Sequence, residues 1–218
     1  MRKDIVLVGI KTNEETDKAV SSLDRAVQNM VTALDSGRVR PSASGLVNTT
    51  SGIVRDVSGL VRDASGLVRD LAEMVKDDAT AEHYKTIVQM IQDLCRETER
   101  FSRSCHTFTD LATREDPDDM IEDAICLVND VCGMVRNTSH LSERVLILPD
   151  GNSRGAVESL GQRSECIRKK VTDLEKQSEF VTDMEETSNL VINASGLVRD
   201  ISGVVRDISG LIRGNGWR

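Results

Sequence analysis

The chain has few aromatic residues and few prolines. Aromatic side chains make up 2% of its 218 residues, and it contains three prolines. A core must therefore be built from Leu, Val, Ile, Met and Ala, as helical bundles usually are. The scarcity of rings leaves no platform for stacked bases, and the net charge of −8 repels a polyanion. We therefore expect no nucleic-acid partner.

Long apolar runs and a secretion signal are also lacking. The longest uninterrupted apolar run is far shorter than the roughly 20 residues that a membrane-spanning helix needs. Residues 1–10 have a basic start and a short apolar run, but Asp4 interrupts them and no small-residue cleavage site follows. We expect a cytoplasmic protein. In that reducing compartment the five cysteines, which lack C-x-x-C spacing, are expected to be small buried apolar residues.

The motifs of metal, phosphate and covalent chemistry are missing as well. His83, His106 and His140 are the only histidines, and no H-x-x-x-H, H-E-x-x-H or C-x-x-C pattern occurs. Glu122 fails to begin an E-x-x-H pair because residue 125 is Ile. Glycines never form a phosphate-binding loop. We expect no catalytic residues, no metal, no cofactor and no enzyme activity.

What the sequence does contain is a repeated phrase of seven residues. It runs through residues 44–75 as SGLVNTT, SGIVRDV, SGLVRDA and SGLVRDL, and returns in residues 194–213 as ASGLVRD, ISGVVRD and ISGLIRG. A period of seven indicates a helix, because strands have a period of two. The apolar positions form an a/d/e face, wider than a coiled-coil seam and suited to a bundle. In the first block they are Leu46, Ile53, Leu60, Leu67 and Met74, with Val47, Val54, Val61, Val68 and Val75 beside them.

Each phrase also carries a glycine. One Gly in an exposed helix interior costs about 1 kcal/mol against Ala. Burial of the two or three aliphatic side chains of a heptad returns roughly 4–8 kcal/mol. Burial outweighs the glycine, provided that another surface covers the apolar face. Two explanations of the glycines stay open: the small Ser-Gly row marks a second close helix contact, or the glycines are neutral.

The polar residues of the phrase suggest contacts between helices. Arg and Asp are adjacent in each phrase, and no Arg has an Asp three or four residues away within the repeat, so they gain nothing as intrahelical ion pairs. The arginine row (Arg55, Arg62, Arg69) and the aspartate row (Asp56, Asp63, Asp70) lie on opposite sides of the polar arc. We expect these rows to face other helices.

The whole chain reads as one all-α domain, an antiparallel bundle of five to six long helices. The expected helices span residues 11–36, 43–77, 80–114, 117–145 and 152–213. The last has a regular seam through Val157, Leu160, Ser164, Ile167, Val171, Leu174, Ser178 and Val181 that can continue into the second block. It is either continuous or broken near residues 187–189. Residues 5–10 form a strand or a helix, between which the sequence does not decide.

Several start signals accompany these helices. Thr12-x-x-Glu15 has the form of a capping box. Ser42 or Ser44, then Thr80, are candidate caps of the next two helices. Asp116-Pro117 is a cap followed by a proline at the first helical position, and Asn152 or Ser153 can cap the last region after a Pro-Asp-Gly turn.

Two functions fit this pattern. The first is a non-enzymatic scaffold or adaptor that contacts a protein partner, or itself, through coiled-coil-like helix packing. The alternative is an amphipathic, apolipoprotein-like protein that binds a membrane surface; it is disfavoured by the net charge, the few lysines and the lack of aromatics in the repeats. We expect the two blocks to lie in one apolar core, within one chain or across a homodimer, with Leu60 and Val61 near Val204 and Val205. The candidate interaction residues are Leu60, Val61, Leu67, Val68, Leu197, Val198, Val204 and Val205.

Overall fold

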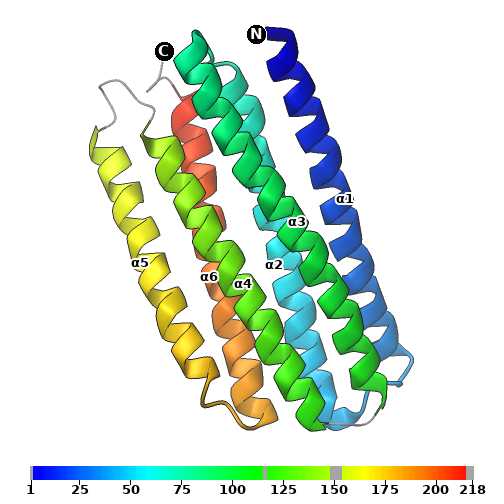
Figure 1. The fold of residues 1–218 in the computed structure, drawn as a ribbon. Coiled ribbons are helices and arrows are strands. Elements are labelled where there is room, and N and C mark those ends of the chain that lie inside the picture. The colour runs from blue at the N-terminus through cyan, green and yellow to red at the C-terminus, as the bar shows by residue number, and fades with distance from the viewer. Residues whose placement is uncertain (1, 115–116, 148–153, 215–218) are drawn as a thin grey trace.

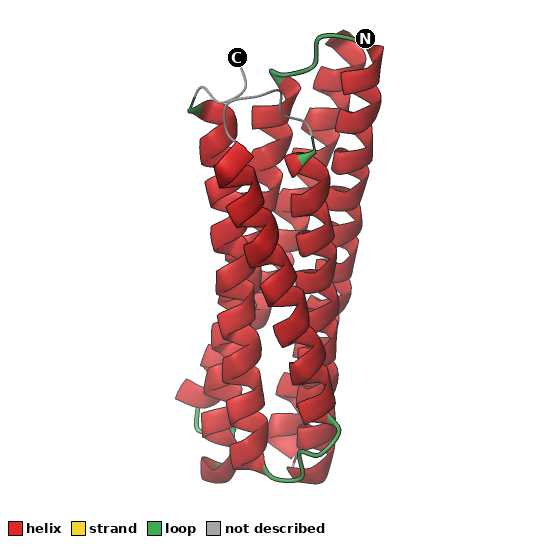
Figure 2. Cartoon of the chain, turned by 90° about the vertical axis from the view of Figure 1, so that its left-hand side faces the viewer, coloured by secondary structure: helices red, strands yellow, loops and turns green. Residues whose placement is uncertain are grey.

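Six long helices form an antiparallel bundle in the computed structural model, which describes residues 2–114, 117–147 and 154–214 (Figure 1). No strand occurs in these residues, and the helices lie nearly side by side along their full length (Figure 2). The all-α bundle predicted from the heptad pattern is confirmed. The helices are α1 (Arg2–Asp35), α2 (Pro41–Ala72), α3 (Asp78–Arg114), α4 (Pro117–Leu146), α5 (Arg154–Ser178) and α6 (Met184–Arg213).

The arrangement places four helices inside and two outside. α2, α3, α4 and α6 contact one another in a ring, α1 packs against α2 and α3, and α5 packs against α4 and α6. Successive helices alternate in direction, so that α2, α4 and α6 all run the same way (Figure 1). The two repeat blocks, which lie on α2 and α6, are therefore parallel neighbours.

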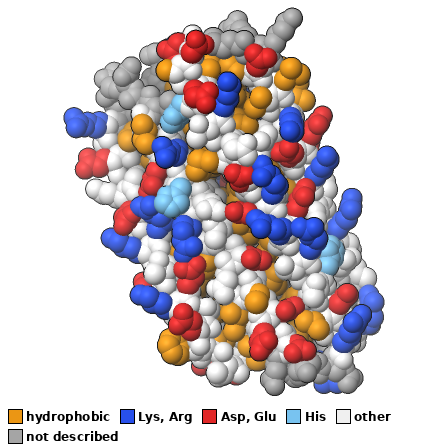
Figure 3. Space-filling model, viewed as in Figure 1, with side chains coloured by type: hydrophobic (Ala, Val, Ile, Leu, Met, Phe, Trp, Pro, Cys, Tyr) orange, Lys and Arg blue, Asp and Glu red, His pale blue; other side chains and the backbone are white. Residues whose placement is uncertain are grey.

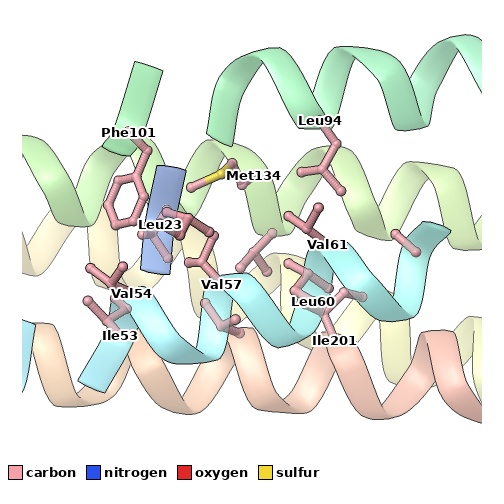
Figure 4. Packing of buried hydrophobic residues seen from close by; sticks show 14 of the residues in the cluster. Leu23, Ile53, Val54, Val57, Leu60, Val61, Leu94, Phe101, Met134 and Ile201 are labelled. Carbon is pink, nitrogen blue, oxygen red and sulfur yellow. The ribbon is translucent and has the colours of Figure 1, made fainter. Parts of the chain in front are cut away.

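The core is aliphatic, as the composition requires. The largest fully buried side chains include Leu23, Leu60, Phe101 and Met134, which come from α1, α2, α3 and α4 (Figure 4). Both repeat blocks contribute to this single cluster of buried residues. The prediction that the blocks share one apolar core is confirmed, and they do so within one chain.

The N-terminal residues settle one open choice and overturn one prediction. Residues 5–10 are helical, because α1 begins at Arg2. The predicted capping box at Thr12 and Glu15 is wrong, since both residues lie inside α1. Thr12 is instead buried, and its hydroxyl donates to the carbonyl of Val8 at 2.8 Å. Such a bond to the residue four positions earlier lets a helix bury a threonine.

The break in the last predicted helix is real but lies earlier than residues 187–189. α5 ends at Ser178, and residues 179–183 connect it to α6. Asp183 caps α6, because its carboxylate accepts from the backbone N–H groups of Glu185 and Glu186 at 2.9 and 2.8 Å. Thr187 lies in the first turn that this cap begins, so a continuous helix over residues 152–213 is wrong for this fold.

Two other start signals also differ from the prediction. At α2 the N-cap position is taken by Arg40, with Pro41 first in the helix, and not by Ser42 or Ser44. At α3 the carboxylate of Asp77 accepts from the N–H of Thr80 at 2.8 Å, while the Thr80 hydroxyl accepts from the N–H of Asp77 at 3.0 Å. Asp77 is thus the cap and Thr80 its reciprocal partner. The predicted cap at Asp116, the turn at 149–151 and the cap at Asn152 or Ser153 lie outside the described residues.

Candidate interaction site

The interface between α2 and α6 is a ladder of three identical rungs. The hydroxyls of Ser195, Ser202 and Ser209 donate to the carboxylates of Asp56, Asp63 and Asp70, in that order. Each pair is separated by 139 residues in sequence, which is the signature of two parallel helices in register. The same carboxylates also meet Arg199, Arg206 and Arg213 at 3.5, 3.5 and 3.4 Å.

Neighbouring Arg and Asp residues of the phrase point to different helices. On α2, Arg62 reaches away from α6 and lies 3.5 Å from Asp24 of α1. On α6, Asp200 lies 3.4 Å from Lys170 and Asp207 lies 2.5 Å from Arg163, both on α5. The prediction is confirmed for the aspartate row, which faces α6, and for Arg62 of the arginine row, which faces α1. One phrase therefore serves α2 and α6 alike, although each helix has a different outer neighbour.

The eight candidate interaction residues all lie in the bundle core. Leu60, Val61, Leu67 and Val68 from α2, and Leu197, Val198, Val204 and Val205 from α6, are all buried. The structure brings them together with one another, and none is at the surface of this chain.

The register refines one predicted contact. With an offset of 139 residues, Leu60 lies at the level of Arg199, and its apolar neighbour on α6 is Ile201 (Figure 4). Val204 lies about 7.5 Å further along the helix axis, by the rise of 1.5 Å per residue. The predicted region therefore lies in the shared core, with Val204 and Val205 about one helical turn beyond the level of Leu60 and Val61.

The glycines of the repeat line no close helix contact. A Cβ atom added at Gly45, Gly52, Gly59 or Gly66 would meet no atom within 4 Å outside its own helical turn. On α6, Gly203 is the exception, with the Arg163 side chain 3.7 Å away. The glycine row therefore lies on the open side of the phrase, and the close-contact explanation is wrong.

An apolar strip remains exposed on the N-terminal part of α1. Val6, Leu7 and Ile10 are 59%, 64% and 51% exposed. Their spacing places them on one side of the helix, and Ile5 on the other side is buried. We call Val6, Leu7 and Ile10 the N-terminal strip. The sequence held a signal for it, since Ile5 to Val8 are all apolar and one helix cannot turn four consecutive residues toward one core.

A groove of about 760 Å³ lies between α3 and α4. Met90 and Leu94 contribute apolar lining, while arginines and carboxylates from α3 form much of its rim. Arg96 is paired with Asp93 at 2.9 Å, and Asn137 donates to Glu97 at 2.8 Å. Both charge signs are interspersed over this face of the molecule (Figure 3). The groove therefore has no preference for a cation or an anion.

The prediction that all five cysteines are buried holds for Cys95, Cys105 and Cys132 and is wrong for Cys126 and Cys166, which are exposed. Burial raises the pKa of the Cys132 thiol to about 12 and also raises the pKa of Cys105, so both stay protonated at neutral pH. His83 contacts the carbonyl of Arg144 at 2.9 Å, and His106 contacts Asn29 at 2.9 Å. Within the part of the chain that the structure describes, no three His, Cys, Asp or Glu side chains form a group that could hold a metal.

Comparison of the chain with protein-family models, with curated proteins and with solved structures finds no match. Among the helices that the structure describes, none is both long enough and apolar enough to cross a bilayer.

Proposed function

We propose that this chain is a non-enzymatic structural protein of scaffold or adaptor type, which acts through helix–helix pairing. The observation that supports this function is the ladder between α2 and α6. The same seven-residue phrase is present on both helices, and it pairs with itself through three equivalent Ser–Asp–Arg rungs. The serines and arginines of α6 and the aspartates of α2 take part in this recognition between helices.

The ladder supplies specificity in addition to stability. Burial of the apolar face is non-directional and would accept several rotations and levels of α6. A hydrogen bond from a buried serine to a carboxylate has a fixed geometry, and a displaced helix would leave buried hydroxyls without acceptors. Rungs of this kind therefore select a partner helix that carries the same period. This is the chemistry of a protein-interaction module.

The N-terminal strip is the surface on which we place an external protein partner. Val6, Leu7 and Ile10 have the spacing by which an amphipathic helix presents its apolar residues. Lys11 and Glu14, both exposed, border the strip, so its margin carries both charge signs. The proposed occupant is an amphipathic helix that lays its apolar face on the strip.

The lipid-binding alternative makes a different demand on the structure. An apolipoprotein-like protein meets lipid with the apolar faces of its repeats. Here the faces of both blocks lie in the core, so the bundle would have to open before they could reach a membrane. We therefore rank the protein-interaction function first.

Vesicle binding distinguishes the two functions. The intact protein is mixed with neutral and with anionic vesicles, and flotation is measured together with far-ultraviolet circular dichroism. We expect the protein to stay in the soluble fraction with unchanged helicity. Co-flotation accompanied by increased helicity would reverse the ranking in favour of lipid binding.

Photocrosslinking tests the position of the protein contact. A photoreactive residue replaces Leu7 in one version of the full chain and the exposed Lys18 of the same helix in the matched control. We expect a discrete crosslinked partner from position 7 and none from position 18. An unlabelled wild-type chain added as competitor should reduce this crosslinking. An unlabelled chain that carries Leu7→Asp should not reduce it. Equal crosslinking from both positions would refute the strip as the contact.

A further inference from the structure

The connection between α5 and α6 differs from three of the other four connections; residues 73–77, between α2 and α3, are the one other connection without proline or glycine within it or next to it. The three prolines of the chain, Pro41, Pro117 and Pro149, lie at the connections α1–α2, α3–α4 and α4–α5. Gly37, with φ +67°, also ends α1 in a conformation that favours glycine. Residues 179–183, which read EFVTD, contain neither proline nor glycine. Their sequence is compatible with a continuous helix.

The segment of residues 179–183, here called the hinge, is kept bent by few hydrogen bonds. The cap at Asp183 holds its C-terminal end, and the N–H of Thr182 donates to Glu186 at 3.3 Å. At its start, Phe180 donates its N–H to Gln177 at 3.1 Å. The regular seam of α5 extends into the hinge at Val181. In the bent hinge Val181 also packs against the core, so straightening costs this contact together with the cap at Asp183.

Phe180 occupies an unusual position for a large aromatic residue. Its side chain is 77% exposed, the highest value among the exposed large hydrophobic residues of the described chain. The chain has only three phenylalanines, and the other two, Phe101 and Phe108, are fully buried. In the bent hinge Phe180 has no apolar environment.

The direction of α6 relative to α5 allows the α6 of one copy of the chain to occupy the α6 site of another copy. α5 runs toward the hinge and α6 runs away from it (Figure 1). If the hinge straightens, α6 leaves its own bundle at that end and continues along the axis of α5. A second copy, related to the first by a two-fold axis perpendicular to the helices, lies beyond the hinge in the opposite orientation. The site that its own α6 has left then accepts a helix that runs in the same direction as the extended α6 of the first copy. Every rung of the ladder can then form between chains as it forms within one.

We propose that two copies of this chain exchange α6, with α5, the hinge and α6 forming one continuous helix in each copy. The partner is therefore a second copy of the chain, and the exchange rests on the proposed function because it takes the ladder as the recognition element. Short hinges favour such exchange, which is a low-cost route to dimers. The two hinges pass each other at the two-fold axis, where the two Phe180 side chains bury against the opposite hinge.

Hinge variants of the full chain test the exchange. Each protein is unfolded, refolded at a series of concentrations and analysed by size-exclusion chromatography with light scattering. The wild type should give monomer and dimer. Loss of a helix cap shifts the equilibrium between the bent and the straight hinge roughly fivefold toward the straight form. Because two hinges straighten in one dimer, Asp183→Ala should raise the dimerisation constant about 25-fold. Val181→Pro should abolish the dimer, since proline disrupts a continuous helix.

Two controls separate exchange from general destabilisation. Asp77→Ala removes the equivalent cap of α3 and should leave the dimer fraction unchanged. Asp183→Asn keeps a capping side chain and should behave as the wild type. A wild type and an Asp183→Ala protein that both stay monomeric would overturn the exchange, as would a dimer that survives Val181→Pro or grows with Asp77→Ala.

Isotope mixing then identifies which chain supplies α6. Lys170 of α5 and Asp200 of α6 lie 3.4 Å apart and can be joined by a carbodiimide. Labelled and unlabelled chains are refolded together, and the dimer fraction is crosslinked and digested. Exchange predicts Lys170–Asp200 peptide pairs that combine one labelled and one unlabelled chain, whereas a surface dimer gives none. Failure here leaves the vesicle and photocrosslinking results, and hence the proposed function, unaffected.

Discussion

At the scale of single residues, the heptad phrase divides its positions between contact and open space. The apolar positions enter the core, and the Asp and Arg positions reach neighbouring helices. The glycines have no such contact, because a Cβ at most of these positions would meet nothing within 4 Å. Glycine lowers the stability of a helix interior through the entropy of the unfolded chain. The glycines of the repeat therefore lower the stability of the protein without making a contact in return.

Replacement of repeat glycines by alanine should stabilise the protein. Gly59→Ala and Gly66→Ala should each raise the free energy of unfolding by about 0.5–1 kcal/mol. The two sites are about 10.5 Å apart along the helix, so their effects should add. Urea denaturation of the single and double variants measures both quantities.

Gly37 provides the opposite control for this prediction. A Cβ atom added there would also meet nothing within 4 Å, but the φ of Gly37 is +67°. Alanine in the left-handed region costs roughly 1–2 kcal/mol, so Gly37→Ala should destabilise the protein. If the repeat variants were destabilising too, the glycines would have a role that the packing does not reveal.

At the scale of helices, the rungs explain why α2 and α6 take one register among several. A shift of α6 by one heptad would match apolar residues to apolar residues again. It would also move one rung beyond the end of the ladder and displace the loops. Each rung joins a buried serine to a carboxylate that is mostly shielded, with the side chain of Asp63 only 25% exposed.

The middle rung should show measurable coupling. Asp63→Ala leaves the buried hydroxyl of Ser202 without its acceptor and should cost about 1–2 kcal/mol. Ser202→Ala removes the same bond, so a double-mutant cycle should give a coupling energy of about 0.5–1.5 kcal/mol.

Asp207→Ala is the matched control on the outer face of α6. The Asp207 side chain is about half exposed in its pair with Arg163, and such pairs contribute about 0–1 kcal/mol. Its loss should therefore be smaller than that of Asp63. A coupling energy near zero between residues 63 and 202 would mean that the rung adds nothing to burial.

The helices themselves were predictable from the sequence, but several of their ends were not. Periodicity places the five expected helical spans, the last of which the structure divides into α5 and α6, because burial of an amphipathic face decides secondary structure over long stretches. The hinge was misplaced because residues 179–183 contain no proline or glycine, and tertiary packing of α6 on α2 decides where the chain turns. The start of α1 was missed because apolar residues 5–8 match a strand as well as a helix. The rungs required the register, which a seven-residue repeat leaves degenerate.

At the scale of the whole molecule, α6 completes the bundle. It contacts α2, α4 and α5, and so closes the ring of inner helices and provides a surface for α5. Its parallel pairing with α2 is possible because three helices intervene in the chain and return it to the same direction. Of the two repeat blocks, the second is therefore a structural part of the core.

Deletion of residues 194–218 should destroy the cooperative fold. It removes the second block and exposes the face of α2 that holds Val57, Leu60 and Val61, each of which is fully buried. Burial of such a side chain is worth about 1.5–3 kcal/mol, whereas a typical domain has a total stability of about 5–15 kcal/mol. The loss of several such burials is comparable with the whole free energy of folding. The truncated chain should aggregate or melt at a far lower temperature, as measured by light scattering and thermal circular dichroism.

Deletion of residues 1–7 is the control, because it removes one helix end on which Val6 and Leu7 are already exposed, and it should lower the melting temperature only slightly. A chain without residues 194–218 that stayed monomeric with an unchanged melting temperature would show the second block to be an independent appendage.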